Sequence, residues 1–519
     1  MMTTTTTWVR NALIRQATLL AAVALCAAAP LGAQITSYEV DLNDQTDDRF
    51  KVTVHVEGLT AEDDIFQFAS TAPGTYQVMD IGRYVSDFQA LDADGRSVGT
   101  EQASTNQWRF SEPERVRTIR YAIAETWDTP VEENNVYMMC GSSLEVDHAL
   151  ISPHSVFGFP ARRQNDPVRV RFQHPGEWRI GTALVPDEES WYDADDYDHL
   201  VDSPFLMGRL SMASMSVGDV PVEVWVYSKT DVVQAENLLG DMEAMLNSAG
   251  LFLEGLPVDR YAFLWHFEDA SQGAWEHSYS SEYVLAEPET WTDEFGQGLT
   301  DIAAHEFFHV VTPLNIHSEI IEDFNFEEPT PSLHIWLYEG VTEWAAHAMQ
   351  IRTRLIGLEE YFGRLAQKVI IDQRYFDTEY SLRDLAFGSY SEYGQSQWGN
   401  IYMRGSLVAG LLDIRLLELS GGQSGLRELI LELADEYGKD RPFPEDRFFE
   451  IVAEKTYPEV GDFFQRYIME AQPLPLEEYF AKIGIRYSDD PQPSFELMGN
   501  ATPEQVALRR AWLRLRPAA

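Results

Sequence analysis

The sequence is almost devoid of cysteine, because Cys26 and Cys140 are the two among 519 residues. Cys26 lies in an apolar N-terminal segment that we expect to be removed, which leaves Cys140 alone. A single thiol forms no intramolecular disulfide, so the domains must be stable through their own hydrophobic cores. No nucleophile signature surrounds Cys140, and we interpret it as a buried or incidental thiol. A lipid anchor on Cys26 is disfavoured, because Leu25 stands where such motifs need a small residue.

Basic residues are also scarce. The chain has 38 Lys and Arg residues but 84 Asp and Glu residues, which gives a formal net charge of −46 at pH 7. This excess makes nucleic acid and anionic membrane surfaces unfavourable partners. The acidic residues are spread along the whole chain, which favours adaptation to a saline environment as their cause. Attraction of cationic substrates, such as free peptide amines, is the functional alternative.

Long apolar runs are missing as well. The segment Ala17 to Ala29 is too short to span a bilayer. Arg10 and Arg15 precede it, and the small residues around Ala33 follow it, which is the pattern of a secretory signal peptide. We therefore expect residues 1–33 to be removed by cleavage near Ala33. A secreted or periplasmic protein without a stable membrane anchor follows from this interpretation.

The first part of the remaining chain has the periodicity of strands. Apolar and polar residues alternate over residues 50–56 and 168–172, and turn signals recur between such segments. The pattern predicts an N-terminal antiparallel β domain over residues 35–215. Its turn at residues 72–76, Ala-Pro-Gly-Thr-Tyr, is interpreted as structural, with a functional role as the alternative.

The second part changes from strands to helices. Segments 220–227 and 261–267 predict strands with a helix between them, and helical spacing prevails after residue 298. We therefore expect an α+β fold with a second domain over residues 216–487, mostly helical after residue 298. Residues 488–519 are expected to form a C-terminal tail.

The most informative motif is His305-Glu306-Phe307-Phe308-His309. Residues four apart lie on the same face of a helix, so the imidazoles of His305 and His309 can reach one metal ion. Glu306 would project beside them and act on a water at that point. A catalytic zinc site uses three protein ligands and keeps a fourth position open, so one further ligand is required.

Glu339 is the candidate third ligand. The sequence predicts a helix from Thr300 to Pro313 for the first motif, and a second helix over residues 333–354, capped by Ser332. Gly340 falls inside the second helix, where glycine lowers the stability of a helix by about 1 kcal/mol relative to alanine. A close contact with the backbone at Gly340 would explain that cost.

Two further acidic residues, Glu276 and Glu343, could complete the site. Gly273 and Ala274 precede Trp275 and Glu276, which suggests an edge strand that approaches a substrate backbone, with Glu276 accepting a cationic group. A β-turn with a solvated glutamate is the alternative. Glu343 follows Glu339 by one helical turn and could orient a zinc histidine, or be a solvated surface residue.

The motifs together resemble the M61 family of metallopeptidases, the glycyl aminopeptidase family, which shares the thermolysin-like fold of the gluzincins. The resemblance extends from about Tyr38 to Tyr487. Residues 273–277 resemble the family's G-G-x-E-H, and residues 402–405, Tyr-Met-Arg-Gly, resemble its Y-x-K-G. The tail after residue 487 is too short for the PDZ domain of many members.

The resemblance implies a role for each candidate residue. It implies one Zn²⁺ per chain, held by His305, His309 and Glu339. It further implies Glu306 as general base, Tyr402 as the donor that stabilises the oxyanion, and Glu276 as the anchor of the substrate α-amine. From spacing alone, Tyr402 lies near the start of a helix and could equally be a core or surface residue.

The leading interpretation is a secreted zinc aminopeptidase that releases small N-terminal residues, Gly or Ala, from peptides with a free N-terminus. A zinc endopeptidase or broad-specificity peptidase is the second hypothesis. A catalytically silent peptide-binding protein on the same scaffold is the third. The intact Glu306 and Tyr402 argue against the third hypothesis.

Overall fold

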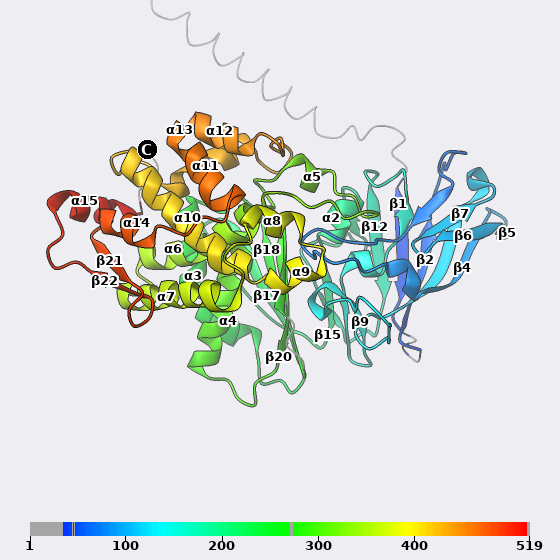
Figure 1. Ribbon diagram of the computed structural model, residues 1–519. Coiled ribbons are helices and arrows are strands. Elements are labelled where there is room, and N and C mark those ends of the chain that lie inside the picture. Colours follow the sequence, from blue (N-terminus) through cyan, green and yellow to red (C-terminus); the bar gives the residue numbers. More distant parts are fainter. Residues whose placement is uncertain (1–34, 44, 46, 270–272, 516–519) are drawn as a thin grey trace, which may run out of the picture.

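The computed structural model describes residues 35–43, 45, 47–269 and 273–515, so the expected signal peptide lies outside the described residues. The fold is α+β, as the sequence predicts. A β-rich N-terminal region lies at one end of the molecule and a helical C-terminal region at the other, with a central sheet between them (Figure 1).

The described residues of the N-terminal region form three sheets. The largest has the order β14 (Tyr192–Ala194), β12 (Val168–Gln173), β1 (Thr36–Asp41), β2 (Arg49–His55), β8 (Thr118–Ala124), β4 (Val85–Leu91) and β5 (Ser97–Val98). The second has the order β13 (Arg179–Gly181), β15 (Phe205–Gly208), β10 (His148–Ile151) and β9 (Ser143–Leu144). The third has the order β11 (Phe159–Pro160), β3 (Ile65–Gln67), β7 (Gln107–Phe110) and β6 (Thr100–Ser104).

The period-two pattern produces this core directly. In β2, Phe50, Val52 and Val54 are buried while the residues between them face outwards. The expectation of antiparallel pairing has one exception, because β1 pairs with β12 in parallel.

The central sheet is formed by residues 211–286, which follow the N-terminal region. Its order is β16 (Ser211–Val217), β17 (Val220–Ser228), β18 (Tyr261–Glu268), β20 (Ser280–Ala286) and β19 (Gly273–His277). Strands β17, β18 and β20 are parallel, and β19 runs antiparallel at the edge. Strand β18 is apolar on both faces, because Phe263 and Trp265 pack on the helical side and Leu264 packs towards the N-terminal region.

Helices cover the other face of this sheet and form the C-terminal region. Those nearest the motifs are α3 (Ala235–Leu253), α4 (Asp293–Phe308), α6 (Thr342–Thr353), α7 (Leu358–Tyr375) and α10 (Asn400–Leu419). The others are α5 (Glu319–Glu322), α8 (Leu382–Phe387), α9 (Glu392–Gln397), α11 (Leu426–Glu436), α12 (Phe448–Lys455), α13 (Pro458–Phe464), α14 (Leu476–Lys482) and α15 (Pro503–Trp512). The short helix α2 (Tyr197–Val201) packs in the core of the N-terminal region. None of the helices in the described part of the chain has both the length and the apolar character that crossing a bilayer requires.

The predicted start of the first motif helix is wrong. Helix α4 begins two turns earlier, where the Thr292 hydroxyl accepts a hydrogen bond from the Phe295 amide. The Thr300 hydroxyl instead donates to the Gly296 carbonyl within the helix. Thr292 and Thr300 both precede an acidic residue, so the sequence allows either as the N-cap. Tertiary packing of the two additional turns makes Thr292 the N-cap.

The second motif helix also differs from its prediction. A π-helical turn, Trp336–Val341, comes first and contains Glu339, and α6 follows it. Ser332 caps the turn that opens this helix, because its hydroxyl accepts a hydrogen bond from the His334 amide at 3.2 Å, and it also donates to the Glu445 carboxylate. Single π turns inside helices are frequent at functional sites, because they redirect a side chain.

The C-terminal tail is part of the packed structure. Strands β21 (Ile485–Ser488) and β22 (Ser494–Leu497) form a hairpin that crosses the expected boundary at residue 487. The buried Trp512 of α15 contacts Tyr361 of α7, with ring centroids 5.7 Å apart.

A close backbone contact joins the π turn to α10. A Cβ added to Gly340 would lie 2.7 Å from Cα of Gly405, closer than packed atoms allow. This contact accounts for the glycine that the sequence places inside the helix.

We predict that Gly340→Ala lowers the free energy of unfolding by about 1–3 kcal/mol, the usual cost of overpacking. Gly363→Ala is the matched control, because Gly363 lies within α7 with no atom near its added Cβ. That control should gain about 0.4–1 kcal/mol. Urea unfolding followed by circular dichroism measures both, and equal effects of the two substitutions would contradict the proposed contact.

Candidate active site

Three of the predicted residues converge at the end of α4. The Nε2 atoms of His305 and His309 lie 3.3 Å apart, and Oε2 of Glu339 lies 3.5 Å and 3.6 Å from them. Ligands about 2.0–2.1 Å from a tetrahedral zinc ion lie about 3.3 Å from one another. The donor set therefore fits a zinc ion in both chemistry and spacing.

The other ring nitrogen of each histidine is hydrogen-bonded. Nδ1 of His305 donates to Oε2 of Glu343 at 2.8 Å, and Nδ1 of His309 donates to the Thr312 carbonyl at 3.0 Å. In the neutral form of each ring, a proton on Nδ1 leaves the lone pair of Nε2 facing the shared point. The Thr312 carbonyl also accepts from Thr342 of α6 at 3.2 Å, which ties the two motif segments together.

Glu343 is placed to orient His305, the position that the sequence suggested for it. The second carboxylate oxygen of Glu343, Oε1, pairs with the ammonium group of Lys368 and lies 3.6 Å from Nδ1 of His347. Burial alone would raise the pKa of Glu343, but Lys368, His347 and His305 together hold it well below its usual value. An ionised Glu343 favours the proton on Nδ1 of His305.

Glu306 lies on the wall of a cavity of about 420 Å³ above the three donors. Its side chain is 8% exposed. Burial raises the pKa of Glu306 to about 7, with His305 opposing the shift and Glu339 adding to it. A carboxylate with this pKa can both take up and release a proton near neutral pH.

Glu276 comes from the edge strand β19 and faces the same cavity. Its donor atom lies within 4.8 Å of those of Glu306 and His309. Burial, and then the charges of Glu339 and Glu306, raise the pKa of Glu276 well above its usual value. A cationic group beside Glu276 would therefore meet three carboxylates. Ala274 also lines this cavity, whereas Gly273 is not among its lining residues and has a φ of 126°, which favours glycine.

Tyr402 lies in the first turn of α10, beside the donors. Its ring centroid is 5.3 Å from that of His305. Burial raises the pKa of Tyr402 well above its usual value, so its hydroxyl keeps its proton and remains a donor.

The turn at residues 72–76 forms part of the site, contrary to the structural role favoured for it. Gly74 and Tyr76 line the cavity, and Tyr76 has a φ of 46°, in the left-handed region. The ring of Tyr76 lies 4.3 Å from that of Trp398, and a Cβ at Gly74 would lie 2.7 Å from Nε1 of Trp275. In the sequence, the one indication of this role is that an aromatic residue follows the Pro-Gly turn. Cys140 is buried and lies at the edge of the same cavity.

A second cavity, of about 500 Å³, borders the first. The two share Gly74, Tyr76, Trp275 and Glu276. The second is lined by many acidic side chains: Asp195, Asp196, Asp198, Asp202, Glu322, Asp323 and Asp440.

Two imidazoles and a carboxylate at the floor of a cavity, beside a buried glutamate, are the arrangement that metal-dependent hydrolases use. A family model described as Peptidase M61 N-terminal domain matches residues 37–209, and one described as M61 glycyl aminopeptidase matches residues 298–408. Together they cover more than half of the sequence, and the chain belongs to the M61 peptidase family.

A solved structure shares this fold. It is the crystal structure of an aminopeptidase N family protein from Idiomarina loihiensis, with a TM-score of 0.77 over 87% of this chain and 79% of that chain. At 19% sequence identity, this likeness concerns the fold alone. No curated protein matches the chain.

We predict that Glu343→Gln weakens zinc binding by about 10- to 100-fold, because the amide no longer stabilises the Nδ1 proton of His305 with a charge. Equilibrium competition against a chelator measures the affinity. The matched control is Glu322→Gln, which alters a similar glutamate–histidine pair, with His317, away from the donors. Unchanged affinity in Glu343→Gln would show that the contact does not tune the metal.

Proposed function

We propose that this chain is a secreted zinc-dependent aminopeptidase that hydrolyses the first peptide bond of substrates with a small N-terminal residue, Gly or Ala. The proposal is carried by the triangle of His305, His309 and Glu339, with Glu306 and Glu276 on the same cavity. The glycyl aminopeptidase description of the matched family supports the preference for small residues.

The proposed hydrolysis needs an activated water, a group that transfers a proton and a donor that stabilises the oxyanion. A zinc ion at the triangle would lower the pKa of a water and polarise the scissile carbonyl. Glu306 takes a proton from the attacking water and passes it to the departing amine. The Tyr402 hydroxyl donates a hydrogen bond to the oxygen on which negative charge develops.

Glu276 would decide which bond is cut. It holds a substrate ammonium group on the edge strand, a fixed distance from the donor triangle, so the first peptide bond lies over Glu306. The free backbone of β19 can pair with an extended peptide at the same time.

A specific feature favours endopeptidase activity as the second candidate. The acidic cavity continues the first cavity beyond Glu276. Residues preceding the scissile bond could lie there if Glu276 did not anchor an amine.

The first test of the proposal is Glu306→Gln, which keeps the shape of the side chain and removes its basicity. We expect zinc content to stay at the wild-type level, and kcat on glycyl and alanyl arylamides to fall by about 100- to 10,000-fold. Metal analysis and steady-state kinetics measure the two effects. A wild type that binds zinc but cleaves no peptide would support the silent binding protein.

The second test addresses the amine anchor. We predict that wild type cleaves free glycyl and alanyl substrates but not their N-acetylated forms. Glu276→Gln should raise KM for the free amines by about 10- to 100-fold, since a hydrogen bond to a charged group contributes about 1.5–3 kcal/mol. Glu289→Gln, an exposed glutamate after β20, is the control. Equal cleavage of acetylated peptides would favour the endopeptidase.

A further inference from the structure

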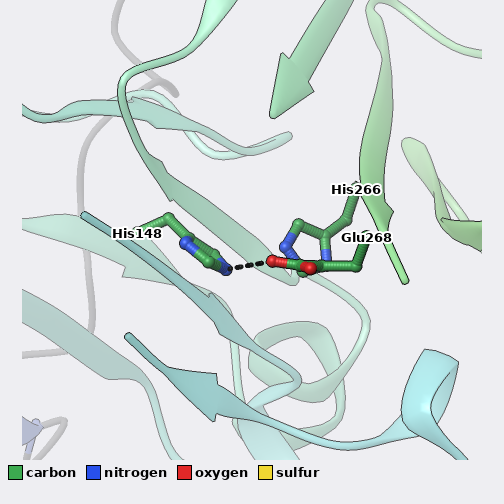
Figure 2. Close-up of side chains that lie close together, drawn as sticks. All are labelled: His148, His266 and Glu268. Atoms are coloured by element: carbon green, nitrogen blue, oxygen red, sulfur yellow. Dashed lines mark ion pairs between the residues drawn. The ribbon is translucent and has the colours of Figure 1, made fainter. Parts of the chain in front are cut away.

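A second group of potential metal ligands lies away from the active site, where the N-terminal region meets the central sheet. His148 comes from β10, and His266 and Glu268 come from β18 (Figure 2). Their donor atoms all lie within 4.8 Å of one another, and Nε2 of His148 lies 3.8 Å from Oε1 of Glu268. We propose that these three side chains form a second divalent-metal site, of the zinc type, that joins the two regions.

Both imidazoles have nitrogen atoms without a hydrogen-bond partner. His148 is 2% exposed and His266 is fully buried. Within the described part of the chain, Nε2 of His148 and both ring nitrogens of His266 are buried and make no hydrogen bond. A buried polar atom without a partner costs about 1–3 kcal/mol. A metal ion at this point would satisfy one nitrogen of each ring.

The tautomer of His148 supports the same assignment. Its Nδ1 donates to Oδ1 of Asp147 at 2.9 Å, so Nε2 carries a lone pair directed at the Glu268 carboxylate. Two electron-rich atoms that face each other are stabilised by a cation between them.

The neighbouring cations leave room for a metal ion. The ammonium group of Lys229 bonds to Oε2 of Glu268 at 2.9 Å, which leaves Oε1 towards His148. Arg209 likewise pairs with Oδ2 of Asp147 at 3.3 Å, which leaves Oδ1 for the histidine. Each carboxylate thus uses one oxygen for a basic side chain and the other for the site.

Aromatic rings cover the two histidines, whereas the Glu268 side chain is 16% exposed. The ring of Tyr227 stacks on that of His148, with centroids 3.8 Å apart. The ring centroids of Trp127 and His266 are 4.9 Å apart. A shielded site strengthens the attraction between an ion and its ligands. The donors are more widely spaced than those of the active site, so we expect weaker binding here.

The position of the site indicates a structural role. Next to it, Leu150 of β10 and Leu264 of β18 belong to the same apolar cluster. An ion held by both strands would add its binding free energy to the packing between the two regions. The proposal does not depend on the peptidase activity.

Metal content of the full chain tests the proposal directly. We expect two zinc ions per wild-type chain by mass spectrometry after equilibration with zinc and desalting. His305→Ala combined with His309→Ala should leave one ion, and Glu268→Gln in that background should remove it. One ion in wild type and none in the double variant would overturn the proposal.

Thermal unfolding supplies an independent readout. In the double variant at the active site, added zinc should raise Tm, and Glu268→Gln or His266→Ala should abolish that rise. His154→Ala is the matched control, because His154 is also fully buried with both ring nitrogens unpartnered, but it belongs to no group of potential ligands among the described residues. A Tm that zinc leaves unchanged, or a rise that survives Glu268→Gln, would contradict the assignment.

Discussion

The active site depends on how closely α10 passes the π turn. Gly340 and Gly405 bring the two backbones into contact, and side chains at either position would force them apart. Glu339 precedes the first glycine and Tyr402 lies about one helical turn before the second, so the contact sets the distance between them. The third donor and the proposed oxyanion donor are thus fixed together by one feature of packing.

The second constraint is the contribution of the N-terminal region to the cavity. The turn with Gly74 and Tyr76 reaches the edge strand β19, and the Tyr76 ring packs at a tilt against Trp398, which precedes α10. The cavity therefore exists only when both halves of the chain are folded against each other. The second group of ligands, His148, His266 and Glu268, lies across the same boundary.

Electrostatics links these features. Glu276, Glu306 and Glu339 converge in a buried space. Burial, and then neighbouring like charge, raises the pKa of Glu276 and Glu306, whereas His305 and His309 hold the pKa of Glu339 below its usual value. Such a group is favourable when cations occupy it, and a metal ion with a substrate ammonium group would supply them. A cation would likewise be favourable beside the Glu268 carboxylate and the buried ring nitrogens of His148 and His266 that make no hydrogen bond.

The sequence by itself determined what short-range geometry controls. The spacing of His305 and His309 fixes them on one helical face, and period two in β2 fixes its buried side. Local signals could not place the start of α4 or the π turn. The alternative N-caps and helical hydrogen-bond patterns differ in free energy by only about 1 kcal/mol, so tertiary packing selects among them. Only the tertiary structure decided that Tyr76 lines the cavity and that His148 meets His266 and Glu268, since contacts between distant segments depend on how the two regions pack.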